Sequence, residues 1–275
     1  MSRYDPQWIT NYFDEDLENE WERLTKTPTS EIKLFIHTHY LKRYVRCGDL
    51  VLEVGAGAGR FTQILVESGA KVVVADISEN QLNLNRKYAT ELKFAEGIKN
   101  WLQLDVCQMN QLENYQFDAV VCYGGPLSYV FDRRTTALQE MLRVLKPNGK
   151  ILISVMSLWG SIRKLLPRTL ESSVEDNTNL VTTGDLCPQN LQGATQRCHL
   201  FRATELAELL ENYKTKVIAM SASNCLSADW GAKLLEVRQN ATKWNKLLKM
   251  ELEASREPGC LDLGTHLIAV AEKAF

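Results

Sequence analysis

The sequence predicts an α/β protein built on a largely parallel β-sheet. Three observations predict this class. Between residues 45 and 156, short apolar stretches typical of strands alternate five times with stretches of helical periodicity. The second apolar stretch, 71–76, is almost continuously apolar, as are strands that are buried on both faces of a parallel sheet. A glycine-rich turn at 55–59 follows the first stretch and leads directly into a helical pattern.

Composition excludes several other classes. The 275 residues carry 45% hydrophobic and 24% charged side chains, as an ordinary globular protein does. A net charge of −2 argues against a dedicated nucleic-acid binder. The seven cysteines form no C-x-x-C pair, which argues against a disulfide framework and against a zinc site. No signal peptide is visible, and no apolar run approaches the about 20 residues of a membrane span. We therefore expect a cytoplasmic protein without a metal and without a membrane or nucleic-acid partner.

The first elements in the chain are helices. Apolar residues recur from Trp8 to Leu24 at three- to five-residue steps, which predicts an amphipathic helix. Thr27 to Ser30 interrupts this pattern and can begin a second helix. That helix carries apolar residues from Ile32 to Tyr44 and ends near Gly48.

The five strands and their connecting helices come next. Ser78 followed by Gln81 forms a capping box that opens one of these helices. A strong turn at 147–149 precedes the fifth strand. We expect strands at 49–54, 71–76, 101–106, 117–122 and 150–156, and helices at 60–68, from 78 onward and at 132–145.

The regular alternation fails after residue 156. The following segment is polar and rich in proline and glycine, which predicts an insertion over the sheet edge. Later elements are a helix at 204–212, a strand at 215–220, a long helix at 229–255 and a last strand at 265–272. We expect one domain, 1–275, made of a lid helix at 1–30, a ligand-binding core at 45–156, a cap insertion at 157–200 and C-terminal strands with an inserted helix at 201–275.

The glycine-rich turn carries the sharpest chemical signal. Glycines allow a tight turn and a close approach of backbone to ligand. The dinucleotide fingerprint G-x-G-x-x-G, counted from Gly55, needs its third glycine at position 60, where this chain has Arg60. The observed spacing is G-x-G-x-G, and it follows the acidic Glu53. An acidic group beside the turn suits a ligand with a cationic group better than a pyrophosphate.

Two further acidic residues end consecutive strands. Asp76 closes the second predicted strand and can accept both hydroxyls of a ribose. Asp105 closes the third and can accept a hydrogen bond from an adenine amino group. Open α/β sheets bind ligands at this edge. A structural interpretation stays open for all three acidic residues. Asp76 can be a helix cap only, Glu53 can form an ion pair with Arg60 or Lys71, and Asp105 can have a purely structural role.

These residues resemble the class I S-adenosylmethionine-dependent methyltransferases. The resemblance is carried by LVLEVGAGAGRFT (50–62), VVVADIS (72–78), LQLDV (102–106), FDAVVCYGGPLSYV (117–130) and MLRVLKPNGKILISV (141–155). It implies a Rossmann-like, seven-stranded, mostly parallel sheet with a reversed last strand and helices on both faces. It also implies S-adenosyl-L-methionine as the cofactor. The residues that it implies for cofactor binding are Glu53, Gly55, Ala56, Gly57, Gly59, Asp76, Ile77, Asp105, Val106, Cys122, Tyr123 and Gly124.

Catalytic residues are less clearly marked. His199 and Tyr123 are the candidates for a general base, although a structural hydrogen bond is the competing interpretation of His199. Tyr4, Tyr12 and Tyr129 are, with Tyr123, candidates for the side that receives the methyl group.

The sequence favours methyl transfer to an O, N or S atom of a small-molecule acceptor by a monomer or simple homodimer. A protein or RNA methyltransferase and a cofactor-binding regulator without activity stay open as alternatives. A nicotinamide-dependent dehydrogenase ranks last because Arg60 occupies the third-glycine position.

Overall fold

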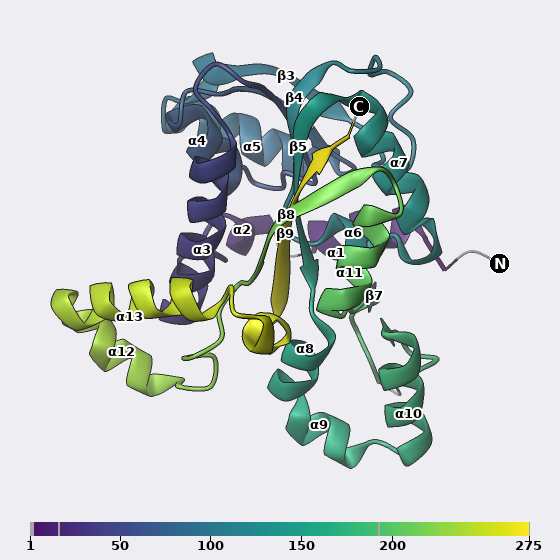
Figure 1. Ribbon diagram of the computed structural model, residues 1–275, viewed down its shortest axis with the longest axis vertical. Helices are drawn as coiled ribbons and strands as arrows, with labels where there is room; N and C mark the ends of the chain where they lie inside the picture. The colour runs from purple at the N-terminus through teal and green to yellow at the C-terminus, as the bar shows by residue number, and fades with distance from the viewer. Residues whose placement is uncertain (1–2, 16, 192, 275) are drawn as a thin grey trace.

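A seven-stranded sheet forms the centre of the molecule (Figure 1). The computed structural model describes residues 3–15, 17–191 and 193–274, so residues 1, 2 and 16 of the predicted lid, 192 of the predicted cap and 275 lie outside the described residues. In spatial order the strands are β3 (Ile98–Gln103), β2 (Lys71–Asp76), β1 (Leu50–Val54), β4 (Phe117–Cys122), β5 (Leu145–Met156), β9 (His266–Lys273) and β8 (Thr215–Ala222). The last strand, β9, is antiparallel to both neighbours and the other pairs are parallel. This confirms the predicted fold class.

Helices cover both faces of the sheet (Figure 1). One face is covered by α3 (Pro28–Tyr44), α4 (Arg60–Glu67), α5 (Glu79–Glu91), α12 (Ala232–Gln239) and α13 (Ala241–Ala254). The other face is covered by α6 (Pro126–Tyr129), α7 (Arg134–Val144) and α11 (Ala203–Glu211). Alternate residues of each central strand enter the two apolar cores, as the period of two in a strand requires. Ile151 and Ile153 of β5 thus lie in one core, and Leu152 lies in the other.

Two further groups of elements lie beyond the carboxyl ends of the parallel strands. The N-terminal group consists of α1 (Pro6–Asp14) and α2 (Leu17–Glu20). The segment after β5 contains α8 (Leu158–Lys164), α9 (Leu166–Glu171), α10 (Val174–Thr183) and a two-stranded sheet of β6 (Asp185–Leu186) and β7 (Cys198–His199). Short 3₁₀ helices occupy Ala95–Gly97, Phe131–Arg133 and Pro258–Leu263. Throughout the described ranges, no helix is both long and apolar enough to cross a bilayer.

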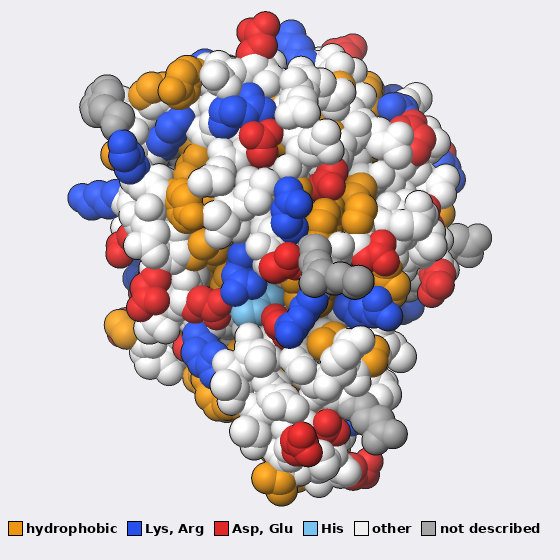
Figure 2. Space-filling view, turned by 90° about the vertical axis from the view of Figure 1, so that its right-hand side faces the viewer, with side chains coloured by type: hydrophobic (Ala, Val, Ile, Leu, Met, Phe, Trp, Pro, Cys, Tyr) orange, Lys and Arg blue, Asp and Glu red, His pale blue; other side chains and the backbone are white. Residues whose placement is uncertain are grey.

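Acidic and basic side chains are intermixed on the face that carries α7 and α11 (Figure 2). On this face the basic side chains do not gather into one continuous patch.

The third strand begins and ends three residues earlier than the sequence predicts. The pairing partner of Val72 in β2 is Ile98, and β3 ends at Gln103. Leu104 and Val106 are buried, each with 7% of its surface exposed, but they lie past the strand. Their apolar character produced the shifted prediction. As a result, Asp105 does not close β3 but follows it by two residues.

Other predicted boundaries also differ from the structure. The helix predicted from Trp8 to Leu24 is two helices, α1 and α2, followed by turns. The long helix expected at 229–255 is two helices, α12 and α13, joined at Asn240. The Asn240 backbone is extended there, and its side chain accepts a hydrogen bond from Lys243 N, which caps α13. The turn predicted at 147–149 is an irregularity inside β5, where the pairing with β4 shifts register and Asn148 has φ of +61°.

Candidate active site

A pocket lies at the carboxyl edge of the sheet, under the N-terminal helices. Its empty volume, including the part open to solvent, is about 700 Å³. The glycine-rich turn contributes Gly55 and Gly57 to its wall, and Asp76 and Asp105 come from the next two strand ends. Gly124, which follows β4, completes the wall near the switch in strand order between β1 and β4. The pocket therefore occupies the edge at which open α/β sheets bind ligands.

Both pocket-lining glycines of the turn have a left-handed backbone, and Gly55 also lies too close to its neighbour for a side chain. Gly55 has φ of +67°, and a Cβ there would lie 2.3 Å from Pro126 Cγ. Gly57 has φ of +53° and donates its N–H to Asp76 Oδ2 at 2.8 Å. A Cβ on Gly57 would enter the space between Glu20 and Gln81, at 3.6 Å from each. Larger residues would fill this space and strain the backbone.

Asp76 is buried at the end of β2 with both carboxylate oxygens engaged. Oδ2 accepts from Gly57 N, and Oδ1 accepts from Ser78 N at 2.9 Å. Burial, aided by the nearby charge of Glu20 and opposed by hydrogen bonds from backbone N–H groups, raises the pKa of Asp76 to about 6. Asp76 thus does organise the start of α5, and it lines the pocket as well.

Glu53 lies behind the pocket rather than in its wall. Its Oε2 accepts a hydrogen bond from Thr62 Oγ1 at 2.6 Å, and neither Arg60 nor Lys71 forms an ion pair with it in the described structure. Asn85 Nδ2 in turn donates to Thr62 Oγ1 at 3.0 Å. Burial raises the pKa of Glu53 to about 8, so this side chain is largely protonated at neutral pH.

Asp105 reaches the pocket from the loop after β3. Its Oδ1 accepts from Cys107 N at 2.7 Å. Tyr4 donates its phenol hydrogen to the Asp105 carboxylate, and burial together with this bond raises the pKa of Tyr4. The neighbouring Leu104 and Val106 supply an apolar surface to the same part of the pocket.

Helix α1 forms part of the cover of the pocket. Ile9 and Phe13 line it. Asp14, at the end of the same helix, accepts from Ser78 Oγ at 2.5 Å and from Asn80 Nδ2 at 2.7 Å. These bonds tie α1 to the first turn of α5.

The segment after α1 adds a charged pair to the pocket wall. Glu20 and Arg23 both line the pocket, and Arg23 Nε lies 3.0 Å from each carboxylate oxygen of Glu20. Trp21, between them, stacks on Tyr88 at a centroid distance of 4.1 Å. Arg60 Nη2 also donates to Trp21 O at 2.8 Å. The residue at the third-glycine position therefore anchors the cover of the pocket.

The structure brings together seven of the twelve cofactor-binding candidates. Those that line the pocket are Gly55, Gly57, Asp76, Ile77, Asp105, Val106 and Gly124, whereas Glu53, Ala56, Gly59, Cys122 and Tyr123 do not. Gly59 lies against Asn85: a Cβ added to Gly59 would be 2.6 Å from Asn85 Nδ2. Cys122 is in the core, and Tyr123 packs edge-on against His37 and Phe61 on the other side of β4.

Sequence reasoning assigned no individual binding role to several polar pocket residues, namely Glu20 and Arg23 of the expected lid and Gln81. The apolar residues Pro126 and Val130 also line the pocket. Gln81 had a detectable signal, since it occupies the third position after the cap residue, and its buried Oε1 lacks a hydrogen-bond partner in the described structure. Such an acceptor is complementary to a ligand N–H or O–H.

Tyr129 and Gln196 connect the pocket to the segment after β5. The Tyr129 side chain lines the pocket, and Gln196 Nε2 donates to its phenol oxygen at 2.9 Å. Of the tyrosines considered for the acceptor side, Tyr4 and Tyr129 line the pocket, whereas Tyr12 and Tyr123 do not.

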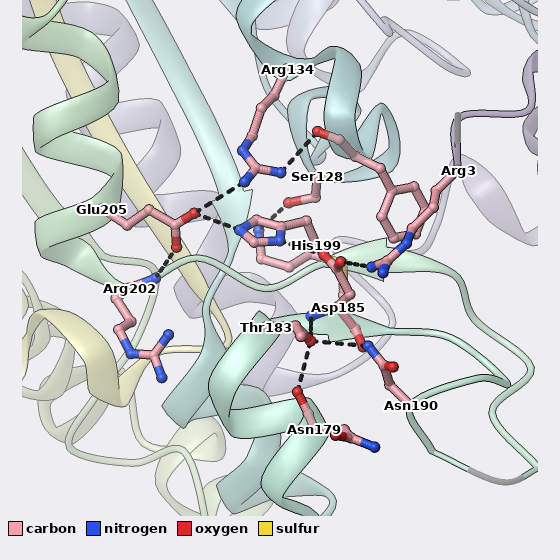
Figure 3. Close-up of polar contacts among 12 residues, drawn as sticks. Arg3, Ser128, Arg134, Asn179, Thr183, Asp185, Asn190, His199, Arg202 and Glu205 are labelled. Carbon is pink, nitrogen blue, oxygen red and sulfur yellow. Dashed lines mark hydrogen bonds and ion pairs between the residues drawn. The ribbon is translucent and has the colours of Figure 1, made fainter. Parts of the chain in front are cut away.

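His199 lies between two carboxylates, away from the pocket wall (Figure 3). Its Nδ1 is 2.6 Å from Asp185 Oδ1, and its Nε2 is 2.7 Å from Glu205 Oε1. Burial alone would lower the pKa of His199, but the two hydrogen bonds outweigh burial and the pKa is raised. Asp185 also pairs with Arg3, and Arg134 lies 3.7 Å from Glu205. The geometry is that of a structural ion-pair network joining β6, β7 and α11.

Comparison with known proteins places the central part of the chain in a family. Residues 52–153 match the family model described as a methyltransferase domain. The chain is 34% identical over 110 residues to a demethylmenaquinone methyltransferase of Clavibacter sepedonicus, an alignment that covers 40% of this chain and 42% of that protein. It is also 34% identical over 113 residues to the ubiquinone/menaquinone biosynthesis C-methyltransferase UbiE of Edwardsiella ictaluri, covering 40% and 43%. The matched region thus spans less than half of these relatives.

Solved structures extend the similarity over the whole fold. The [4+2]-cyclase SpnF has a TM-score of 0.62 at 16% identity and covers 100% of this chain and 98% of its own. The 1,6-didemethyltoxoflavin-N1-methyltransferase of Burkholderia thailandensis, solved with its substrate and S-adenosylhomocysteine, has a TM-score of 0.59 at 17% identity, covering 98% and 88%. The family match over 52–153 agrees with the expected resemblance to the class I S-adenosylmethionine-dependent methyltransferases, and the strand order and the solved structures show the corresponding fold.

Proposed function

We propose that this protein transfers a methyl group from S-adenosyl-L-methionine to a small-molecule acceptor. The observation that carries the proposal is a single pocket in which a glycine turn meets the carboxylates of Glu20, Asp76 and Asp105. A cofactor with a sulfonium, an amino group, a ribose and an adenine offers cationic and hydrogen-bond-donating groups. Acidic side chains complement such groups.

The pocket residues fit this cofactor. A Cβ at Gly57 would occupy the pocket, and the buried Oε1 of Gln81 has no partner in the described structure and requires a donor. We assign Gly55 and Gly57 to the methionine portion, with Glu20 beside them. Asp76 would accept from the ribose hydroxyls.

The adenine and methyl positions follow from the same arrangement. Asp105 with Val106 would hold the adenine, and Tyr4 fixes the Asp105 carboxylate. Gly124 would border the methyl group, as the resemblance to the class I methyltransferases implies, and its place in the pocket wall after β4 supports this. The domain division into lid, core, cap and C-terminal part stays part of this proposal.

The cofactor supplies a methyl group already activated by its sulfonium. The task of the protein is therefore to hold the acceptor atom in line and close, which can lower a barrier by roughly 7–11 kcal/mol. Ile9 and Phe13 of α1 cover the pocket and limit the access of water. A cover of this kind favours a small acceptor over a protein or RNA, which would require a more open site.

The names of the relatives support a small acceptor. The curated relatives above are named for quinone methylation, and the Burkholderia enzyme is named for methylation of a small heterocycle. We extend to this chain only what these names share, a low-molecular-weight acceptor. The fold by itself would not support this step, since one neighbour is named a cyclase.

Calorimetry with S-adenosylhomocysteine, and with NAD as the control, tests the cofactor assignment. We expect S-adenosylhomocysteine alone to bind. Incubation with a labelled methyl donor and separate small-molecule, protein and RNA fractions then tests the acceptor, and we expect label in the small-molecule fraction. Tight binding of NAD would contradict the proposal, and cofactor binding with no label in any fraction would favour a regulator.

A further inference from the structure

A cluster of basic and polar side chains lies beside the pocket, on the face of the sheet covered by α3. Lys33 of α3 donates from Nζ to Thr265 Oγ1 at 2.6 Å. Thr265 Oγ1 lies 3.3 Å from Nδ1 of the adjacent His266. His37, one turn after Lys33, has Nδ1 2.7 Å from Lys33 O and Nε2 2.9 Å from Ser154 Oγ. We call Lys33, His37, Thr265 and His266 the α3 polar cluster.

The hydrogen bonds define which groups of the α3 polar cluster are charged. A carbonyl oxygen only accepts, so His37 donates from Nδ1 to Lys33 O. Burial lowers the pKa of His37 to about 4, so the ring is neutral near pH 7 and its Nε2 accepts from Ser154 Oγ. Lys33 contributes the amino group of the cluster. One of its three N–H donors is used in the hydrogen bond to Thr265.

The α3 polar cluster lies close to the cofactor pocket, although none of its four residues lines the pocket itself. His266 pairs across the sheet with Met156 of β5. Met156 Cγ lies 3.7 Å from the position that a Cβ on Gly125 would take. Arg23 lines the pocket, and its Nη2 lies 4.0 Å from the corresponding position on Gly124. The cluster thus adjoins the part of the pocket that we assign to the methyl group.

Two of the three cations at this place, Lys33 and Lys164, have no carboxylate partner within the described ranges, whereas Arg23 pairs with Glu20. Burial, together with the charges of Lys164 and Arg23, lowers the pKa of Lys33 to about 8. The same three cations, with burial, lower the pKa of His266. A half-buried amine in such surroundings is stabilised by an anion that enters the site.

We infer that the methyl acceptor carries an anionic oxygen group, a carboxylate or a phosphate, which binds to Lys33 with support from Arg23 and Lys164. This inference rests on the proposed function, because it places the acceptor beside the cofactor. Lys33 would hold the acceptor by its anionic end, and the atom to be methylated would face Gly124. Neutral acceptors of the same shape would bind less well, since they would leave the Lys33 charge uncompensated.

Chemical labelling of Lys33 tests this directly. Protein saturated with S-adenosylhomocysteine is treated with an acetylating reagent at pH 8 in the presence of benzoate, phenyl phosphate or the neutral isostere benzamide, and acetylation of each lysine is followed by mass spectrometry. We expect at least one of the two anions to slow acetylation of Lys33 about tenfold at saturation, whereas benzamide does not. The two anions distinguish a carboxylate-binding from a phosphate-binding site. The inference is wrong if neither anion protects Lys33 or if benzamide protects it equally.

Variants separate binding from folding. Lys33→Gln should lose binding of the protecting anion by calorimetry and retain its affinity for S-adenosylhomocysteine. Lys33→Arg should retain anion binding, which a purely structural role of the Thr265 hydrogen bond would not predict. Lys42→Gln, on the exposed side of the same helix, is the matched control and should change neither property. Equal anion binding by wild type and Lys33→Gln would overturn the inference.

Failure of the proposed function can be distinguished from failure of this inference, because S-adenosylhomocysteine binding and anion protection of Lys33 are measured independently. If S-adenosylhomocysteine does not bind, the cofactor assignment fails, and the labelling is repeated without it. Protection of Lys33 by an anion would then still establish an anion site, although not one for a methyl acceptor.

Discussion

The guanidinium carbon of Arg60 lies 3.9 Å from the centroid of the Trp21 ring. This contact joins the first residue of α4 to the segment that covers the pocket. It explains why a chain with a glycine-rich turn has a large side chain at the position where dinucleotide-binding proteins have a third glycine. Arg60 keeps its helix position and uses its side chain to hold the cover.

Arg60→Ala should weaken binding of S-adenosylhomocysteine. The variant loses the stacking on Trp21 and the hydrogen bond to its carbonyl oxygen, so the cover that carries Glu20 is less firmly placed. Cation–π contacts contribute roughly 0.5–2 kcal/mol, which corresponds to a loss of affinity of up to about thirtyfold. Calorimetry measures it. Arg60→Lys keeps the charge without the planar stack and should fall between wild type and Arg60→Ala. Equal affinities for all three would show that the contact is irrelevant to binding.

Asp76→Ala should reduce cofactor affinity by at least about 1–3 kcal/mol, the usual cost of unpairing a charged hydrogen bond. The carboxylate lines the pocket, and it also holds Gly57 N, so both a ligand contact and the turn are affected. The control is Glu113→Ala, which removes an exposed carboxylate that does not line the pocket. Unchanged affinity of Asp76→Ala would remove Asp76 from the site.

Cofactor affinity should also fall in acid because of Asp76. Its pKa is raised to about 6, and only the ionised form can accept hydrogen bonds with both oxygens. Lowering the pH from 7.5 to 5.5 therefore protonates part of the free protein at this position and should weaken binding. Asp76→Asn has no such titration, so its affinity should be lower at pH 7.5 and less sensitive to pH. A wild-type affinity that is constant over this range would contradict the assignment.

Glu53 should make the protein less stable as the pH rises. Its pKa is about 8 in the fold and about 4.5 in the unfolded chain, so between these values the native state binds a proton that the unfolded state does not. The free energy of unfolding should then decrease with pH from this group by at most about 1.4 kcal/mol per unit, and level off above pH 8. Glu53→Gln should remove this slope in chemical unfolding measured at pH 5, 6.5 and 8. Glu91→Gln, an exposed control on α5, should keep it.

Protonation makes His199 charged, whereas it makes Glu53 neutral. Both pKa values are raised in the fold, so the contribution of each group to stability decreases as the pH rises. The pKa of His199 is raised, so its ion pairs with Asp185 and Glu205 stabilise the fold at low pH and this stabilisation is lost as the pH rises through the folded-state value above 6.5. His199→Gln should lower the free energy of unfolding at pH 6 by about 1–3 kcal/mol and by less at pH 9.

The same variant tests the alternative role of this histidine. His199→Gln should bind S-adenosylhomocysteine as wild type does and increase hydrogen exchange in 184–200, which would support the structural role. Loss of methyl transfer with unchanged stability would instead support His199 as a general base.

The sequence predicted the strands at the centre of the sheet well. The expected ranges for β2 and β4 agree with the structure at both ends, because these strands are short, apolar and bounded by turn residues. The bounds of β3 were wrong because Leu104 and Val106 continue the apolar pattern while serving the pocket wall. A local pattern cannot distinguish burial in a sheet from burial in a loop.

The strand-end part of the site was predictable residue by residue, whereas the N-terminal cover could be expected only as a segment. Topology alone brings Gly55, Asp76 and Asp105 to one edge. The positions of Glu20 and Arg23 depend on the stacking of Trp21 against residues distant in the sequence, which no local pattern encodes. The roles of the twelve cofactor-binding candidates stay predictions until ligand binding is measured.

The placement of β9 has a consequence for how the chain folds during synthesis. β5 ends at Met156, but the strand that pairs with its outer edge begins only at His266. The emerging chain must therefore keep an apolar strand edge unpaired while all of 157–265 is translated, and exposed edges of this kind promote misassociation between chains. β8 has no place in the sheet until β9 arrives, because β9 separates it from β5. The half of the sheet that contains the glycine turn can assemble early, and the remainder closes in one late step.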